Sequence, residues 1–342
     1  MSNPMLPSTT PSDAARRLVR GSYDLHVHVA PDVMRRRISD VELARAFLRV
    51  GLAGFVLKSH YVPTAERAAV VNAAVPGCDA LGAIALNSAV GGLNPMAVEI
   101  AAREGARVVW MPTVDAANHR QTARDLPAGA TPPMWLELQD DLRRRGLDAE
   151  PIEVLGVDGN VLPRTRAVLE LIAGHGLVLD SAGRPLPQTR EVLALAAKHQ
   201  LVVATGHLSA FETRAIADAA FEAGVWHVVA THPEFPQQDL TLDEQKSLVD
   251  LGVYLERCLT TPLTGKYPWP EMVSNIRATG VDATIVTTDL GQPHNPPVED
   301  GLALMADAML AAGFTEKEIQ RMTVGNSRLL AGRGEAGPGN PA

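Results

Sequence analysis

Short apolar segments alternate with amphipathic segments along almost the whole chain. Eight of the apolar segments are about four to seven residues long and lack the strict alternation of half-exposed strands. Strands of a parallel sheet that is covered on both faces have this continuous apolar character. We therefore predict eight buried parallel strands, at Tyr23–Val29, Gly54–Lys58, Ala80–Ala85, Arg107–Met111, Leu201–Thr205, His227–Thr231, Val253–Cys258 and Ala283–Thr287.

The amphipathic segments between the strands predict helices. Ser39 and Ser209 precede two of them, and each hydroxyl can accept a hydrogen bond from an otherwise unpaired backbone N–H. Eight strand–helix units predict an α/β protein with a TIM-type (β/α)8 barrel. An open doubly wound sheet has the same periodicity and is the alternative. The predicted helices are Ser39–Val50, Thr64–Ala74, Asn94–Glu104, Ser209–Ala223, Thr241–Leu251 and Val298–Ala312.

The segment between the fourth and fifth strands, about residues 114–200, is too long for one crossover, so we predict an insertion there. It contains an internal repeat, because residues 154–169 resemble residues 178–193 at an offset of 24. Each copy predicts an extended piece, a glycine turn and a helix opened by proline. We expect the duplicated segment to pack on the barrel or to form a dimer contact.

The predicted barrel spans residues 21–331. Prolines punctuate residues 1–20, and residues 332–342 are rich in glycine and proline, so we expect a flexible N-terminus and a disordered tail.

Composition indicates an ordinary globular protein with a small-molecule partner. Apolar residues make up 46% of the 342 and charged residues 20%, and the formal charge of −8 argues against a nucleic acid as partner. No apolar stretch is long enough to span a membrane, and no signal peptide is visible. Two cysteines, Cys78 and Cys258, fit a reducing cytoplasm. A homo-oligomer is compatible with all of this.

Polar residues capable of chemistry stand where the predicted strands end, which is where barrel enzymes carry their active sites. His26 and His28 lie two residues apart on the first strand, so both side chains face the same side while Val27 packs outward. Two imidazoles placed in this way can bind one metal ion, although core histidines bonded to carbonyl groups would give the same pattern. Further polar residues at strand ends are Lys58, His60, His207, His232, Glu256, Arg257 and Asp289.

This pattern resembles the amidohydrolase superfamily of metal-dependent hydrolases. That family has His-x-His on strand one, a histidine after strand five, another after strand six and an aspartate after strand eight. The resemblance implies that His26, His28, His207, His232 and Asp289 bind metal and that Asp289 is also the proton shuttle. Zn²⁺ is the default ion, while Mn²⁺, Fe²⁺ and Ni²⁺ suit similar ligands.

Other segments extend the resemblance. Asn326–Leu330 is similar to the helix that closes these barrels. Thr205–Ser209, Thr231–Phe235 and Thr288–Gln292 look like a bacterial subgroup of unknown function.

The fourth strand departs from the family because it ends in Trp110–Thr113, without the lysine or glutamate that often bridges two metal ions. Lys58 is the nearest substitute, since a buried lysine beside a dication loses its proton and can take up CO₂ as a carbamate. A surface lysine, or one that binds a substrate carboxylate, is the alternative. The site therefore holds one or two ions.

The leading functional prediction is hydrolysis of an amide, lactam, lactone or ester bond of a small molecule. A metal-activated water attacks, Asp289 carries the proton, and the metal or His207 stabilises the oxyanion. A metal-dependent decarboxylase or lyase is the alternative, ahead of a phosphoesterase and of a non-catalytic metal-binding protein. Candidates for substrate binding are His60, His119, Glu256, Arg257, Gln292 and His294.

Overall fold

Eight parallel strands form a barrel in the computed structural model, which describes residues 10–122, 134–147, 150–174 and 201–333. The strands follow one another around the sheet in chain order, and a parallel bridge between Val27 and Leu290 brings the first strand against the end of the last. The predicted TIM-type barrel is confirmed, and each of the eight predicted strands is present. Their bounds are β1 Tyr23–Val27, β2 Gly54–Leu57, β3 Asp79–Ala85, β4 Ala106–Trp110, β5 Val202–Ala204, β6 His227–Ala230, β7 Tyr254–Cys258 and β8 Thr284–Thr287.

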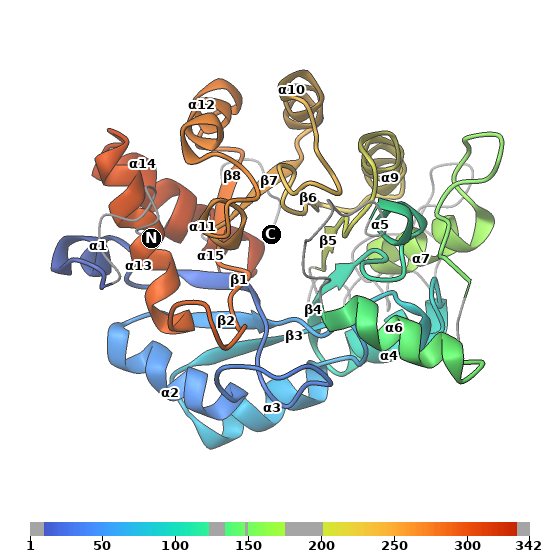
Figure 1. Cartoon of the computed structure of the whole chain (residues 1–342), viewed down its shortest axis with the longest axis horizontal. Helices are drawn as coiled ribbons and strands as arrows, with labels where there is room; N and C mark the ends of the chain where they lie inside the picture. Colours follow the sequence, from blue (N-terminus) through green and yellow to red (C-terminus); the bar gives the residue numbers. More distant parts are fainter. Residues whose placement is uncertain (1–9, 123–133, 148–149, 175–200, 334–342) are drawn as a thin grey trace, which may run out of the picture.

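Helices surround the ring of strands in Figure 1. The predicted caps are confirmed, because Ser39 and Ser209 each form a capping box with the glutamate three residues later. The helices are α1 Asp13–Leu18, α2 Asp40–Val50, α3 Ala65–Ala74, α4 Pro95–Arg103, α5 Ala117–Thr122, α6 Met134–Arg144, α7 Pro163–Gly174, α9 Ala210–Glu222, α10 Leu242–Asp250, α11 Thr260–Leu263, α12 Trp269–Thr279, α13 Val298–Ala311, α14 Glu316–Gln320 and α15 Asn326–Leu330, with short turns at Ser88–Val90 and Arg321–Gly325.

Three apolar layers hold the barrel together. Leu25, Val56 and Val108 belong to a cluster inside the ring of strands, and two larger clusters lie between the strands and the helices. The helix α15 joins the inner cluster through Leu330, and Asn326 donates to the backbone carbonyl groups just before and within β8. The predicted closing helix therefore covers the end of the barrel where the strands begin, which leaves the opposite end for the polar residues.

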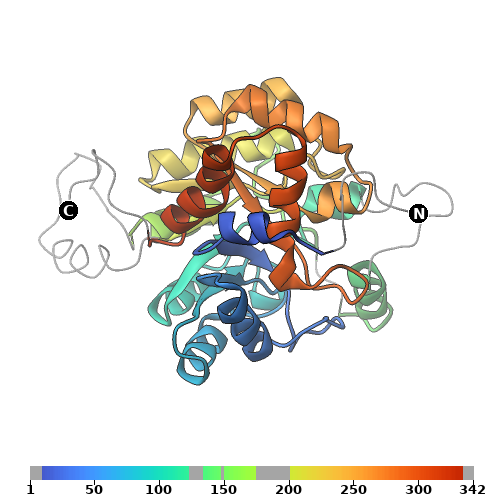
Figure 2. The same cartoon turned by 90° about the vertical axis from the view of Figure 1, so that its left-hand side faces the viewer.

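The ordered packing begins before residue 21, the boundary predicted from the sequence. Ala15 and Leu18 of α1 are buried, and Ser12 bonds to Asp307 of α13. In Figure 2 the dark blue α1 lies against the red and orange C-terminal helices.

The segment between β4 and β5, which the sequence predicts to be an insertion, contains α5, α6 and α7 in its described residues. Leu155 and Val161 form an antiparallel bridge around a turn, and α7 begins at Pro163, as the first copy of the repeat predicts. Most of the second copy, including residues 178–193, lies outside the described residues, as does most of the predicted tail at 332–342. The structural role of the duplication therefore stays a prediction. Within the described residues, none of the helices is both long and apolar enough to cross a membrane.

Candidate metal centre

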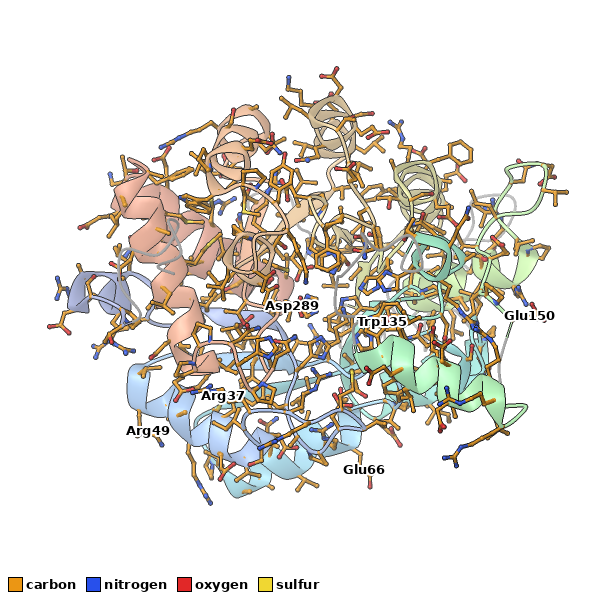
Figure 3. All side chains as sticks on the ribbon, in the orientation of Figure 1. Arg37, Arg49, Glu66, Trp135, Glu150 and Asp289 are labelled. Carbon is orange, nitrogen blue, oxygen red and sulfur yellow. The ribbon has the colours of Figure 1, made fainter. Side chains whose placement is uncertain are left out.

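The ends of β1 and β8 bring together two imidazoles and a carboxylate. Asp289 Oδ1 lies 3.3 Å from Nε2 of His26 and 3.3 Å from Nε2 of His28. One ligand atom from each of these residues lies within 4.8 Å of the other two, so the three can share one ion. Figure 3 shows Asp289 near the middle of the ring of strands. The structure therefore brings together three of the residues that the sequence predicts to bind metal, and the binding itself stays a prediction.

The local backbone aims these side chains. The pairing of β1 with β2 changes register between Asp24 and Val27, and in this part of the chain His26 and His28 face the site while Val27 packs outward. Asp289 has a φ of 52°, a conformation that non-glycine residues seldom adopt, and its N–H donates to His26 O at 2.9 Å. His232, at the end of β6, has a φ of 30°. Strained backbone of this kind concentrates at functional sites.

Glu256 holds the ring of His26 from behind. The Nδ1 atom of His26 donates to Glu256 Oε1 at 2.8 Å, and Thr287 Oγ1 donates to the same oxygen at 2.9 Å. With its proton on Nδ1, His26 presents a lone pair on Nε2 towards Asp289, which is also an acceptor. In this tautomer, a cation between or beside the two acceptors would stabilise the arrangement. A carboxylate behind a metal-binding histidine is the usual arrangement for fixing its ring.

The amine of Lys58 lies at that position. Its Nζ lies 3.0 Å from His26 Nε2 and 5.0 Å from the centre of the Trp110 ring. Burial lowers the pKa of Lys58, and the nearby carboxylates of Asp289 and Glu256 oppose that shift. The amine of Lys58 therefore faces the same lone pair that a metal ion would use.

A second group of imidazoles extends from the first. The ring centre of His207 lies 5.1 Å from that of His232 and 4.3 Å from that of His119, whose ring is 4.5 Å from Trp135. His60 joins the two groups, at 5.0 Å from His28 and 6.1 Å from His207. The two groups therefore form one continuous cluster of six histidines at the barrel end.

Several buried nitrogens of the second group have no hydrogen-bond partner among the described residues. They are Nδ1 of His207, Nδ1 of His232 and both ring nitrogens of His119. Leaving such groups unpaired costs about 1–3 kcal/mol each. The donor set of imidazoles and a carboxylate fits a divalent ion such as Zn²⁺, and the unpaired nitrogens indicate that a ligand completes this region.

The site is electrostatically prepared for neutral imidazoles and ionised carboxylates. Burial lowers the pKa of His28 to about 3 and that of His232 to about 4. Burial alone would raise the pKa of Asp289, but His26 and His28 hold it well below its ordinary value. The same balance, with His26 as the main opposing group, lowers the pKa of Glu256 to about 2. Neutral imidazoles and carboxylates are the forms that bind a metal ion.

Arg257 does not reach the histidines, contrary to the prediction that it binds substrate. Neighbouring residues of a strand face opposite sides, so Glu256 points to His26 and Arg257 points outward. Its fully buried guanidinium forms an ion pair with Glu234 and donates to Gln245 and Thr279. Arg257 therefore joins the barrel wall to α10 and α12.

The loop after β8 is also arranged differently from the prediction. Gln292 accepts a hydrogen bond from Asn295, and His294 is exposed and contacts none of the described histidines of the cluster. Glu256, another predicted substrate contact, instead bonds to His26. The predicted positions of His60 and His119, by contrast, are within the cluster.

Three contributors were missed in the sequence. Thr260 donates to Asp289 Oδ2 at 3.0 Å, Thr113 Oγ1 lies 2.8 Å from His60 Nδ1, and Trp135 packs on His119. Thr113 lies three residues after the end of β4 and Thr260 two residues after the end of β7, so their position near strand ends was an available signal. Trp135 comes from α6 in the insertion, and its sequence position gave no such signal.

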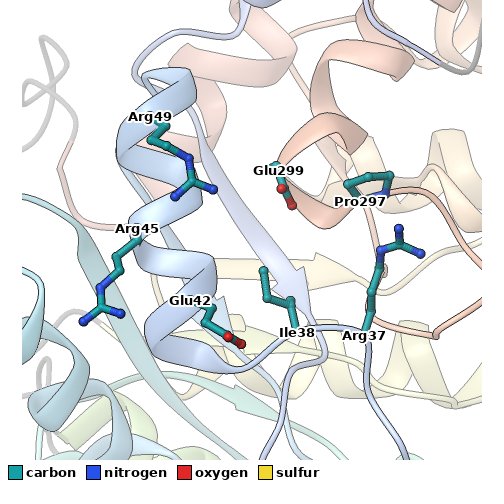
Figure 4. A pocket seen from close by; sticks show the side chains of 7 residues that line it. All are labelled: Arg37, Ile38, Glu42, Arg45, Arg49, Pro297 and Glu299. Atoms are coloured by element: carbon teal, nitrogen blue, oxygen red, sulfur yellow. The ribbon is translucent and has the colours of Figure 1, made fainter.

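A surface hollow of about 420 Å³ is separate from this cluster (Figure 4). It lies between α2 and the start of α13, and its lining includes Arg45, Arg49 and Glu299. None of the proposed metal ligands lines it.

The sequence profile of DUF6282, described as a family of unknown function, matches residues 21–182 and 177–256. The chain belongs to this family. No curated protein matches the chain in sequence. The predicted resemblance to a group of unknown function is thereby confirmed.

Solved structures share the fold. An amidohydrolase from Pseudomonas aeruginosa is similar with a TM-score of 0.53 at 11% identity, over 94% of this chain and 98% of that one. A protein provisionally assigned as 2-pyrone-4,6-dicarboxylic acid hydrolase, from Pseudomonas putida, is similar with a TM-score of 0.51 at 15% identity, over 92% and 98%. The predicted likeness to amidohydrolase barrels is therefore confirmed at the level of the fold.

Proposed function

We propose that the chain is a metal-dependent hydrolase that cleaves an amide, lactam, lactone or ester bond of a small molecule. The observation that carries this proposal is the convergence of His26, His28 and Asp289 within reach of one ion. An ion bound there would supply a nucleophile from water at neutral pH and polarise the carbonyl group under attack. Two imidazoles and a carboxylate favour Zn²⁺.

The chain's own residues provide the proton transfer. Asp289 is ionised at neutral pH because its pKa is held well below the ordinary value, so it can accept a proton. Its Oδ2 is fixed by Thr260, and its side chain is 16% exposed, which leaves it open to a reactant. His207 lies close enough to His232 to face the same reacting group, and we assign it the role of stabilising the oxyanion.

The test is the Asp289→Asn variant of the metal-reconstituted protein. Turnover of a panel of cyclic amides, lactones and esters should fall at least about 100-fold, since general acid–base catalysis contributes about 10²–10⁴. Most of the bound metal, measured by elemental analysis, should remain. Asp282→Asn is the matched control, because Asp282 precedes β8 at the other end of the barrel and its side chain is 82% exposed.

Full activity of Asp289→Asn, or turnover by a preparation without stoichiometric metal, would contradict this mechanism. Release of CO₂ as the product would instead support the alternative of a decarboxylase on the same ligands.

We further propose that Lys58 bridges two ions as a carbamate. The lowered pKa favours a neutral amine, which attacks CO₂ and loses one proton as the N–C bond forms. Mass spectrometry of the native, metal-loaded protein should show the mass of one added CO₂. The Lys58→Met variant should lose that mass and bind one ion fewer than the wild type. An unchanged metal content in Lys58→Met would argue against the bridge.

A further inference from the structure

Lys266 lies on a loop that is tied to the proposed proton shuttle. The loop follows β7 and contains α11, whose first residue, Thr260, donates to Asp289 Oδ2 at 3.0 Å. The backbone N–H of Lys266 donates to Thr261 O at 3.0 Å, so Lys266 is anchored to the same short loop. Loops that follow strands surround the active end of a barrel.

A chain of ring contacts connects Lys266 with the histidine cluster. Its Nζ lies 4.3 Å from the ring centre of Phe235, in the loop after β6, and the ring of Phe235 is 4.8 Å from that of His232. The ring of Phe235 therefore contacts both the ammonium group and His232, which belongs to the histidine cluster. A cation placed on an aromatic face keeps its other directions free for an anion.

The charge of Lys266 is uncompensated in the part of the chain that the structure describes. No carboxylate there lies within ion-pair distance of its Nζ, whereas Lys246, the nearest lysine in sequence, pairs with Asp243 at 3.9 Å. Lys266 is nevertheless within electrostatic reach of the site. Asp289 and Cys258 raise its pKa against the lowering effect of burial, and Lys266 in turn lowers the pKa of His119.

The charges at the barrel end add up in favour of an anion. Asp289 and Glu256 are the two carboxylates that lie against His26 at this end of the barrel, and a bound divalent ion would offset both of their charges. With Lys58 neutral, Lys266 would then leave this end of the barrel positive, although the whole chain carries −8. Lys266 itself is exposed to solvent, so an incoming carboxylate can reach its ammonium group beside the Phe235 ring.

We propose that Lys266, seated on Phe235, binds a carboxylate group of the substrate while the scissile bond lies at the metal centre. The substrate class is then a small molecule that carries a carboxylate besides the bond to be cleaved. The position of the scissile bond at the metal centre rests on the proposed hydrolase function, but the binding of the carboxylate by Lys266 does not depend on turnover.

Binding to the zinc-loaded full-length protein tests the assignment. The probes are succinate, glutarate and isophthalate, each compared with its own monomethyl ester. Both members of a pair offer one carboxylate to the metal, and only the diacid has a second for Lys266. Tryptophan fluorescence reports binding, because Trp110 lies beside Lys58 and Trp135 beside His119.

At least one diacid should bind about tenfold more tightly than its ester, the value of one hydrogen bond to a charged group. Lys266→Met should remove this preference, and Lys266→Arg should keep it. Lys317→Met, which changes an exposed lysine of α14, is the matched control and should behave as the wild type. The same unfolding midpoint in all variants verifies that they are folded.

The absence of any diacid preference in the wild type, or its persistence in Lys266→Met, overturns the assignment. The failure of the hydrolase proposal would look different, because the diacid preference would remain while no ester, lactone or amide is cleaved. Equal turnover of neutral and carboxylated substrates would contradict the role of Lys266 and leave the hydrolase intact.

Discussion

Two buried glutamates, Glu256 and Glu234, serve different purposes although both lie close to strand ends. Glu256 accepts hydrogen bonds from His26 and Thr287 inside the barrel. Glu234 pairs with Arg257 outside it. A carboxylate behind a metal ligand tunes the affinity for the ion, whereas a buried ion pair affects the stability of the fold.

The Glu256→Gln variant should therefore lose metal affinity by about 10–100-fold, because the ring of His26 keeps its place but loses the negative charge that makes Nε2 a stronger ligand. Competition with a chelator of known affinity measures the change. Glu234→Gln is the matched substitution, since it removes one partner of a buried ion pair. It should lower the free energy of unfolding by about 3 kcal/mol or more and leave metal affinity unchanged. Equal loss of metal affinity in both variants would contradict these roles.

At the scale of elements, the loop after β8 is held against the end of β1. His28 N donates to Leu290 O at 2.9 Å, and Arg37 N donates to Gly291 O at 2.7 Å. Gly291 has a φ of 143°, and a Cβ atom there would lie 1.8 Å from His28 O. Only glycine permits this approach, which places Asp289 beside His26 and His28.

The Gly291→Ala variant should force the two segments apart. We expect a loss of about 3 kcal/mol or more in unfolding free energy, from backbone strain and the enforced shift, together with reduced zinc content. Gly313→Ala is the control, because Gly313 has a φ of 78° with open space around it, and it should cost only about 1–2 kcal/mol. Urea denaturation and elemental analysis measure both effects. An alanine that is tolerated equally at the two positions would show that the close approach does not position the site.

The elements that periodicity controls were predictable from the sequence, and the details that tertiary contacts control were not. Continuous apolar runs identified all eight strands, and their ends located His207 and His232 at one face of the barrel. The register change between Asp24 and Val27 belongs to the pairing of β1 with β2, and the positive φ of Asp289 lies where the chain leaves β8, so both are set by contacts between strands that no local pattern encodes. The outward direction of Arg257 was available from strand alternation, since Glu256 faces inward.

On the scale of the whole molecule, the barrel separates two kinds of interior. Apolar side chains fill the ring beneath the site, and α15 covers that end. Buried histidines gather at the other end. Five of them have a pKa below the ordinary value of histidine: His28, His60, His119, His207 and His232. Burial is the main cause in every case. Folding the metal-free chain therefore requires these imidazoles to be neutral.

This requirement predicts that the metal-free protein is destabilised by acid. Below about pH 6.5 the unfolded chain protonates these histidines, and the folded chain resists until its own lowered pKa is reached, so stability falls as the pH falls. Asp24 acts in the opposite sense, because burial raises its pKa to about 7, but it is one group against five. Each additional proton bound by the unfolded state costs about 1.4 kcal/mol per pH unit.

Urea denaturation of chelator-treated protein at pH 7.5, 6.5 and 5.5 should show a decline that steepens below pH 6.5. The variant His227→Gln serves as a calibration, because burial lowers the pKa of His227 too, and this residue lies at the start of β6, at the opposite end of that strand from His232. Removing His227 should reduce the slope of unfolding free energy against pH by the equivalent of at most one proton. Most of the decline should persist, because it comes from the histidines of the cluster. Because zinc binds only neutral imidazoles, added zinc should raise the urea midpoint of unfolding at pH 7.5, and this increase should shrink as the pH falls. An unfolding free energy that stays constant between pH 7.5 and 5.5 would contradict this prediction. It would mean that the folded chain binds as many protons as the unfolded chain in this range, although its histidines are buried.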